Sequence, residues 1–167
     1  MAALVHVAVG FASRPLSKKV PVGLLIVATE FLDILAIGLS VVGLEKNGFA
    51  PWSHGLFMAG AWSALFAIIG WLIYGSYRTG LLLGTLVFSH WLIDFITHPM
   101  GAVFGGRPLP PDLPLFFAGS ARVGLGLYNH SIVLAYAIEY GSTLAGIAVY
   151  VIYRVRHRRK VRSAAGA

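Results

Sequence analysis

The chain has 167 residues, of which 57% are hydrophobic and 11% are charged, and its formal net charge at pH 7 is +7. A soluble domain carries about 25% charged residues, so this composition excludes an ordinary soluble protein and predicts a single membrane domain. Cysteine is absent. Disulfides, thiolate ligands and cysteine nucleophiles are thereby excluded, and any metal must be held by nitrogen and oxygen atoms.

Four apolar stretches are long enough to cross a membrane, which takes about 20 residues. Residues 1–13 come before them and are too short to span, so they are expected to form an interfacial or re-entrant helix. The Pro- and Gly-rich stretch 98–129 is long for a connection, which often indicates a functional loop. The expected spans are 20–44, 55–74, 79–97 and 131–153.

The expected fold is therefore an all-α integral membrane protein with about four transmembrane helices and a short N-terminal helix. Residues 1–155 form a single transmembrane helical domain, and residues 156–167 form a basic cytoplasmic tail.

Lysine and arginine are distributed unevenly over this topology. With both termini in the cytoplasm, three of these residues face outward: Lys46, Arg107 and Arg122. Ten face inward: Arg14, Lys18, Lys19, Arg78, Arg154, Arg156, Arg158, Arg159, Lys160 and Arg162. The positive-inside rule thus favours a multi-pass protein of a bacterial inner membrane, with stretch 98–129 on the periplasmic side. The basic tail is expected to bind anionic lipid, and nucleic acid is not expected as a partner.

Ionisable residues inside the expected spans point to a site. Four of the six acidic residues lie there, where a charge is costly and usually functional: Glu30, Asp33, Asp94 and Glu139. His90 and Asp94 are four residues apart and share one face of a helix, and His98 follows one turn later. His54 lies at the outer end of the second span.

These positions all fall in the outer half of the expected bundle. Nitrogen and carboxylate donors at such spacing suit a divalent cation, with zinc as first choice and manganese or magnesium as alternatives. The predicted ligands for one or two ions are Asp33, His54, His90, Asp94, His98 and Glu139. Each also has an interpretation without metal: the pair His90 and Asp94 could join two helices by a hydrogen bond, and Glu139 could pair with Arg122.

Two sequence motifs resemble a known family. The segments Pro51–Leu56 (PWSHGL) and Ser89–Phe95 (SHWLIDF) resemble the paired motifs of bacterial inner-membrane proteins described as membrane-bound metal-dependent hydrolases. Further matching stretches are Phe31–Leu35 with Gly43–Glu45, and Pro111–Leu115 with Gly124–Asn129. This resemblance implies a metal-dependent hydrolase.

A more distant likeness is to zinc-dependent phospholipase C and the S1/P1-type nucleases. Their metal ligands follow an order that this chain matches with His6, Asp33, His54, His90, Asp94, His98 and Glu139. The N-terminal Trp and the late His-x-x-x-Glu of those enzymes are missing, which implies one or two ions instead of three. His6 is suggested by this likeness alone, because the expected topology places it near the cytoplasmic side.

The expected reaction is hydrolysis of a phosphoester in a lipid or lipid-linked substrate by metal-activated water. Asp112 is expected to act as general base or to orient a ligand, and Arg107 and Arg122 are expected to hold phosphate. Two alternatives stay open: an ion- or metal-binding or transport protein, which an oligomer could complete, and a structural subunit without catalysis. For the latter, Gly80 and Gly84 offer a close-packing face.

Overall fold

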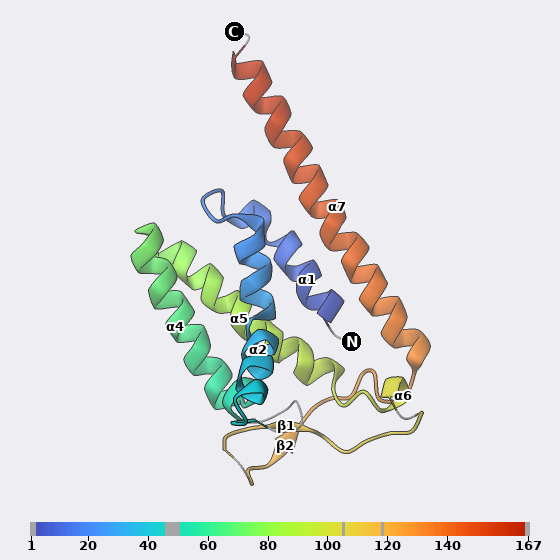
Figure 1. Ribbon diagram of the computed structural model, residues 1–167. Helices are drawn as coiled ribbons and strands as arrows, with labels where there is room; N and C mark the ends of the chain where they lie inside the picture. The colour runs from blue at the N-terminus through green and yellow to red at the C-terminus, as the bar shows by residue number, and fades with distance from the viewer. Residues whose placement is uncertain (1–2, 46–50, 105, 118, 166–167) are drawn as a thin grey trace.

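The computed structural model describes residues 3–45, 51–104, 106–117 and 119–165 (Figure 1). Helices make up most of it, with one short antiparallel sheet. In chain order the elements are α1 (Ala3–Ala12), the 3-10 turn η1 (Arg14–Leu16), α2 (Val22–Val41), α3 (Pro51–His54), α4 (Leu56–Tyr74), α5 (Tyr77–Thr97), α6 (Gly101–Phe104), β1 (Leu113–Pro114), β2 (Arg122–Val123) and α7 (Ile132–Ala165).

In the described part of the chain, four helices are long and apolar enough to cross a membrane: α2, α4, α5 and residues Ile132–Arg159 of α7. Their outer faces carry large apolar side chains, and Ile37, Leu72 and Val133 are 66%, 72% and 74% exposed. Apolar surface of this extent fits contact with lipid better than contact with water. The expected all-α membrane fold is confirmed. The first three predicted spans agree with the observed helices to within a few residues, whereas α7 continues well beyond the predicted end at residue 153.

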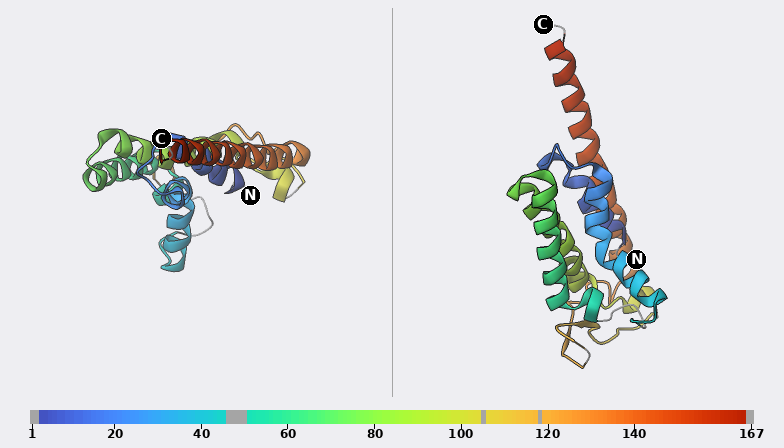
Figure 2. Two further views of the ribbon diagram at one scale, coloured as in Figure 1. Left: turned by 90° about the horizontal axis from the view of Figure 1, so that it is seen from above. Right: turned by 60° about the vertical axis from the view of Figure 1, so that its left-hand side comes forward.

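The spanning helices alternate in direction, so the connections gather at two opposite ends (Figure 1). The loop between α1 and α2, the α4–α5 turn and the far end of α7 lie at one end, where the basic residues are concentrated. The long segment between α5 and α7 lies at the other. Figure 2 shows α7 continuing as a helix beyond the bundle, so residues 156–165 extend this helix.

Helix α5 is the centre of the bundle. Half of the residues in its 18-residue apolar stretch are buried, compared with 11% of those in the corresponding stretch of α4. Leu83 and Val87 of α5 pack with Leu25 and Leu32 of α2 in the main core. Glycine permits the close approach of α4, since a Cβ added at Gly84 would lie 2.6 Å from the Ser63 carbonyl oxygen.

Helix α1 is too short to span: it begins about halfway along the bundle and runs to the basic end (Figures 1 and 2). It is held between α2 and α7 through two glycines. A Cβ on Gly10 would lie 2.8 Å from the Ile26 Cα, and one on Gly146 would lie 2.5 Å from the Ala8 carbonyl oxygen. This close packing places the first turns of α1 beside the last two turns of α5, where His6 contacts His90 and Asp94.

The segment after α5 folds back over the end of that helix. The backbone N–H groups of Leu125, Leu127 and Tyr128 donate to the carbonyls of Phe95, Ile96 and Thr97 at 2.7, 2.9 and 3.1 Å. The last carbonyls of a helix have no partner within it, so these bonds complete the end of α5. The segment also forms the two-stranded sheet of β1 and β2, in which Leu113 pairs with Val123. The described residues between α5 and α7 therefore cover this end of α5, and we call them the covering segment.

Candidate metal centre

Five predicted residues meet in the interior, contributed by four helices. They form what we call the His/Asp cluster: His6 of α1, Asp33 of α2, His54 of α3, and His90 and Asp94 of α5. His6, His54, His90 and Asp94 are 3% exposed or less. The Asp33 side chain is 45% exposed and is the accessible member.

The two carboxylates face the three imidazoles at short range. His54 Nε2 lies 3.2 Å from Asp33 Oδ1 and 3.5 Å from Asp94 Oδ2. His90 Nε2 lies 3.6 Å and 3.3 Å from the same two oxygens. His6 Nε2 lies 3.3 Å from the other Asp94 oxygen, Oδ1.

These separations suit ligands of one small cation. Nitrogen and oxygen ligands about 2.0–2.1 Å from a tetrahedral ion are about 3.3 Å from one another. The four distances that join His54 and His90 to Asp33 and Asp94 lie between 3.2 and 3.6 Å. The donor atoms are therefore spaced as a divalent ion requires.

The orientation of His90 leaves its Nε2 lone pair inside the cluster. His90 Nδ1 lies 2.6 Å from the Thr29 carbonyl oxygen, which can only accept, so Nδ1 carries a proton. Among the described atoms, His90 Nε2 is buried without a hydrogen-bond partner, although the Asp33 and Asp94 oxygens are near. Metal-binding histidines characteristically donate their second nitrogen to a carbonyl or carboxylate in this way.

His54 is oriented by a second chain of hydrogen bonds. The Ser53 hydroxyl donates to Glu45 Oε2 at 2.7 Å, and the Ser53 backbone N–H donates to Glu45 Oε1 at 2.8 Å. Because that hydroxyl has one proton, His54 Nδ1, 2.8 Å away, must donate to it. The Nε2 lone pair of His54 then faces Asp33 and Asp94.

The Nε2 lone pairs of His54 and His90 thus point toward carboxylate oxygens. Both kinds of atom accept hydrogen bonds, so a cation is needed between them. Protons on the imidazoles are one source, but the rings of His6 and His90 stack with centroids 3.8 Å apart and planes 8° apart. Two imidazolium ions stacked this closely would repel each other. The buried His/Asp groups are therefore able to hold a metal ion, which satisfies these atoms without charging the rings.

The described residues provide two groups of three potential ligands, His6–His90–Asp94 and Asp33–His54–His90. His90 is common to both, and its Nδ1 is already engaged by Thr29, so its Nε2 can bind one ion at a time. Asp94 presents Oδ1 to His6 and Oδ2 to His54 and His90. A single ion, or two ions bridged by Asp94, is compatible with this arrangement.

The position of His6 corrects the expectation from topology. That expectation placed His6 near the cytoplasmic side, but the path of α1 into the bundle brings it into contact with Asp94. The physical reason is the close packing of Gly10 and Gly146, which a hydropathy pattern does not reveal.

The remaining predicted residues are not members of the cluster. Within the residues that the structure describes, neither group of three includes His98 or Glu139. His98 Nδ1 lies 3.2 Å from Asp112 Oδ2, and the Arg122 guanidinium donates to the Asp112 carbonyl oxygen at 2.7 Å. Arg107 is exposed. A direct role of these residues in metal binding or catalysis stays a prediction.

Glu139 has a clear structural contact. The buried Tyr128 hydroxyl donates to Glu139 Oε1 at 3.0 Å. Burial, followed by the nearby Glu139 charge, raises the pKa of Tyr128, so the phenol keeps its proton and stays a donor. The backbone of Leu4 and Val5, in the first turn of α1, lies near the same carboxylate. Glu139 therefore ties α7 to the covering segment and lies beside the helix that carries His6.

Sequence reasoning missed the residues that orient the ligands. Glu45 and Ser53 are 2% and 0% exposed and fix His54. The adjacency of Ser53 and His54 was a weak signal, and Glu45 was noted only as part of a motif. Thr29 acts through its backbone carbonyl, which no side-chain motif reports.

Comparisons of the chain with models of protein families, with curated proteins and with solved structures find no match. Function is therefore inferred from the geometry of the His/Asp cluster and from the residues around it.

Proposed function

We propose that this chain is a membrane-embedded, metal-dependent hydrolase that cleaves a phosphoester of a lipid or lipid-linked substrate. The observation that supports it most is the convergence of His54 Nε2 and His90 Nε2 on Asp33 and Asp94 at 3.2 to 3.6 Å. The resemblance of the segments around His54 and His90 to membrane-bound metal-dependent hydrolases points in the same direction.

The donor set favours zinc. Three imidazoles and two carboxylates are ligands that zinc accepts, and thiolate sites are excluded by the absence of cysteine. A bound divalent ion of this kind lowers the pKa of a water ligand toward 7 and polarises a phosphoryl oxygen. The chain's own contribution is to hold His54 and His90 in one tautomer, through Ser53 and Thr29.

The exposure of Asp33 suits a catalytic centre. Structural zinc sites are closed by protein ligands, whereas catalytic sites keep an accessible position. Asp33 is 45% exposed at its side chain, while the other ligands of the cluster are buried. Substrate and water would reach the centre from the α2 side.

The surroundings of that opening favour a lipid substrate. Ile37 lies one turn after Asp33 on the same face of α2, and Ile34 is adjacent. These side chains are 66% and 49% exposed, so the accessible edge of the cluster borders an apolar surface. A substrate with an acyl or prenyl chain would contact this surface while its phosphate lies at the cluster.

Carboxylates beside the cluster supply candidate proton acceptors. Glu30, one turn before Asp33, has an Oε1 atom that is buried and has no hydrogen-bond partner among the described atoms. Asp112 contacts His98 on the covering segment. Arg107 and Arg122 are exposed on that segment, where their guanidinium groups are available to an anionic headgroup.

The proposed location is a bacterial inner membrane with both termini in the cytoplasm. The basic residues gather at the end of the bundle opposite to the α5–α7 segment (Figure 1). By the positive-inside rule the basic end is cytoplasmic, and the cluster then lies in the half nearer the periplasm.

The test combines metal analysis with an activity assay. Detergent-purified protein, His90→Ala, Asp94→Ala and the control His130→Ala are analysed for bound metals. The same samples are assayed for release of phosphate or phosphorylated headgroup from phosphatidic acid, phosphatidylglycerol and a polyprenyl monophosphate. Wild type and His130→Ala should hold about one or two divalent ions per chain and hydrolyse at least one substrate. Both cluster variants should lose metal and activity.

Two results would contradict the proposal. If the wild type stays metal-free after zinc is added, the His/Asp cluster only joins helices and binds no metal. A stoichiometric metal that exchanges across proteoliposomes, without hydrolysis of any lipid phosphoester, would instead establish a metal-handling protein.

A further inference from the structure

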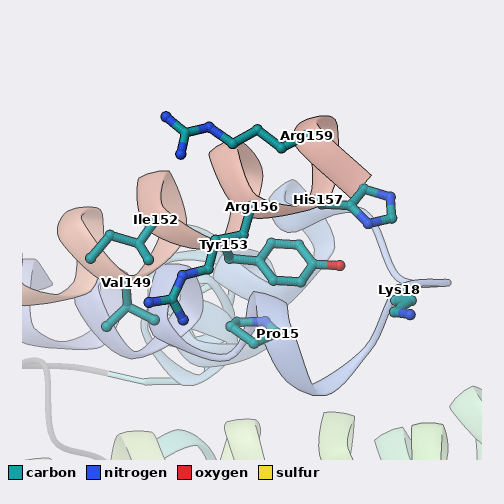
Figure 3. A pocket seen from close by; sticks show the side chains of 8 residues that line it. All are labelled: Pro15, Lys18, Val149, Ile152, Tyr153, Arg156, His157 and Arg159. Carbon is teal, nitrogen blue, oxygen red and sulfur yellow. The ribbon is translucent and has the colours of Figure 1, made fainter. Parts of the chain in front are cut away.

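A second feature lies at the basic end of the bundle, away from the His/Asp cluster. A groove of about 790 Å³ runs between the η1 region and α7 (Figure 3). Its lining is apolar toward the bundle, with Pro15, Val149 and Ile152, and the ring of Tyr153 faces Pro15. Its rim is basic.

The wall of the groove is held in place by Arg14. Its guanidinium donates to the Ser17 carbonyl and, at 3.1 Å, to the Val20 carbonyl. It also lies 5.6 Å from the centroid of the Tyr153 ring. These contacts fix the turn after η1 against α7, so the groove is built into the fold.

The cations at the rim have no acidic counterpart in this part of the sequence. Lys18, Arg156 and Arg159 line the groove. No Asp or Glu occurs in residues 1–29 or 140–167. The positive charge at this end is therefore not neutralised by carboxylates of the neighbouring segments, and an external anion would neutralise it.

We propose that this groove binds one anionic phospholipid. Arg156 would hold the phosphate, Lys18 on the other side of Tyr153 would contact the rest of the headgroup, and Val149 and Ile152 would contact the first part of an acyl chain (Figure 3). Val149 and Ile152, which form the apolar floor of the groove, belong to the last span, and the two arginines of the rim follow them on α7. The groove therefore crosses the boundary between apolar and charged surface. A basic pocket between helices at the cytoplasmic boundary is a characteristic headgroup site. A free phosphate would have no use for the apolar floor.

This inference does not depend on the hydrolase function. The substrate of the proposed reaction would enter near Asp33, whereas this lipid lies at the opposite end. Its occupancy would anchor the η1 region and α7 in the cytoplasmic leaflet.

The test counts bound lipid on the full chain in a mild detergent by native mass spectrometry. Dioleoyl phosphatidylglycerol and dioleoyl phosphatidylcholine are titrated separately. The double variant Lys18→Gln with Arg156→Gln removes two rim charges. The matched control, Arg154→Gln with Arg158→Gln, removes two charges of α7 that do not line the groove.

The expected result is preferential binding of phosphatidylglycerol by wild type and by the control. A basic residue near an anionic headgroup contributes about fivefold in affinity, so the rim double variant should bind roughly 25-fold more weakly. Equal losses in the two double variants would show diffuse attraction to the tail and overturn the proposal. Equal binding of both lipids would also overturn it. Full competition by inorganic phosphate at the concentration of the lipid would show a free-anion site instead of a lipid site.

Discussion

The hydrogen-bond chain behind His54 allows the metal-centre proposal to be tested without touching a ligand. Ser53→Ala removes the hydroxyl that accepts from His54 Nδ1 at 2.8 Å and donates to Glu45 Oε2 at 2.7 Å. His54 would lose the contact that fixes its tautomer and ring orientation. Loss of such an orienting partner typically reduces metal affinity by about 10- to 100-fold, or about 1.4–2.7 kcal/mol.

A second effect of the same substitution must be separated from the first. Glu45 is 2% exposed, so its Oε2 atom would be left buried without the hydroxyl, at a cost to folding of about 1–3 kcal/mol. This cost does not require metal. It should therefore appear as a lower melting temperature in the presence of a chelator, whereas the loss of affinity appears only in metal titrations.

The assay is competition for zinc against a chromogenic chelator, with the detergent-purified protein. The matched control is Ser89→Ala, because the Ser89 hydroxyl donates only to the Leu86 carbonyl of its own helix, at 2.7 Å. Ser89→Ala should bind zinc as wild type does. Equal zinc affinities for Ser53→Ala and wild type would refute the assignment of His54 as an oriented ligand.

Three further predictions follow from the packing and the metal. Gly146→Leu should displace α1, because a Cβ there would lie 2.5 Å from the Ala8 carbonyl oxygen. We expect the free energy of unfolding to fall by about 1–3 kcal/mol, as measured by thermal unfolding. Zinc binding should be weaker than in His6→Ala, because the whole helix would move. Tyr128→Phe should lower stability by about 1–3 kcal/mol through loss of the bond to Glu139, and the difference should persist from pH 7 to pH 9. The raised pKa keeps this phenol protonated below its ordinary value of about 10, so a difference that vanished within this range would contradict the assignment. Removal of metal by a chelator should lower the melting temperature of wild type, because free ligand at 100 times its Kd stabilises by about 2.7 kcal/mol, and Asp94→Ala should show no such shift.

The membrane architecture could be predicted from residue pattern alone. Span length and apolar content depend on neighbouring residues in the sequence, and the bilayer sets the required length independently of any tertiary contact. The same holds for the pairing of His90 with Asp94, since four residues make about one helical turn. A close-packing face at Gly80 and Gly84 could also be predicted from small residues on an apolar helix, but only the structure shows that this face meets α4.

Which side chains meet across different helices was decided by tertiary packing. Asp33 and His54 were expected in the cluster, yet their contact with His90 and Asp94 depends on the path of α2 and α3 around α5. His6 entered the cluster because two glycines let α1 run deep between α2 and α7, and the partner of Glu139 was set by the position of Tyr128. The orientation of His54 and His90 came from Glu45, Ser53 and the Thr29 carbonyl, and such partners are set by the fold because a hydrogen bond needs position and direction that sequence spacing does not define.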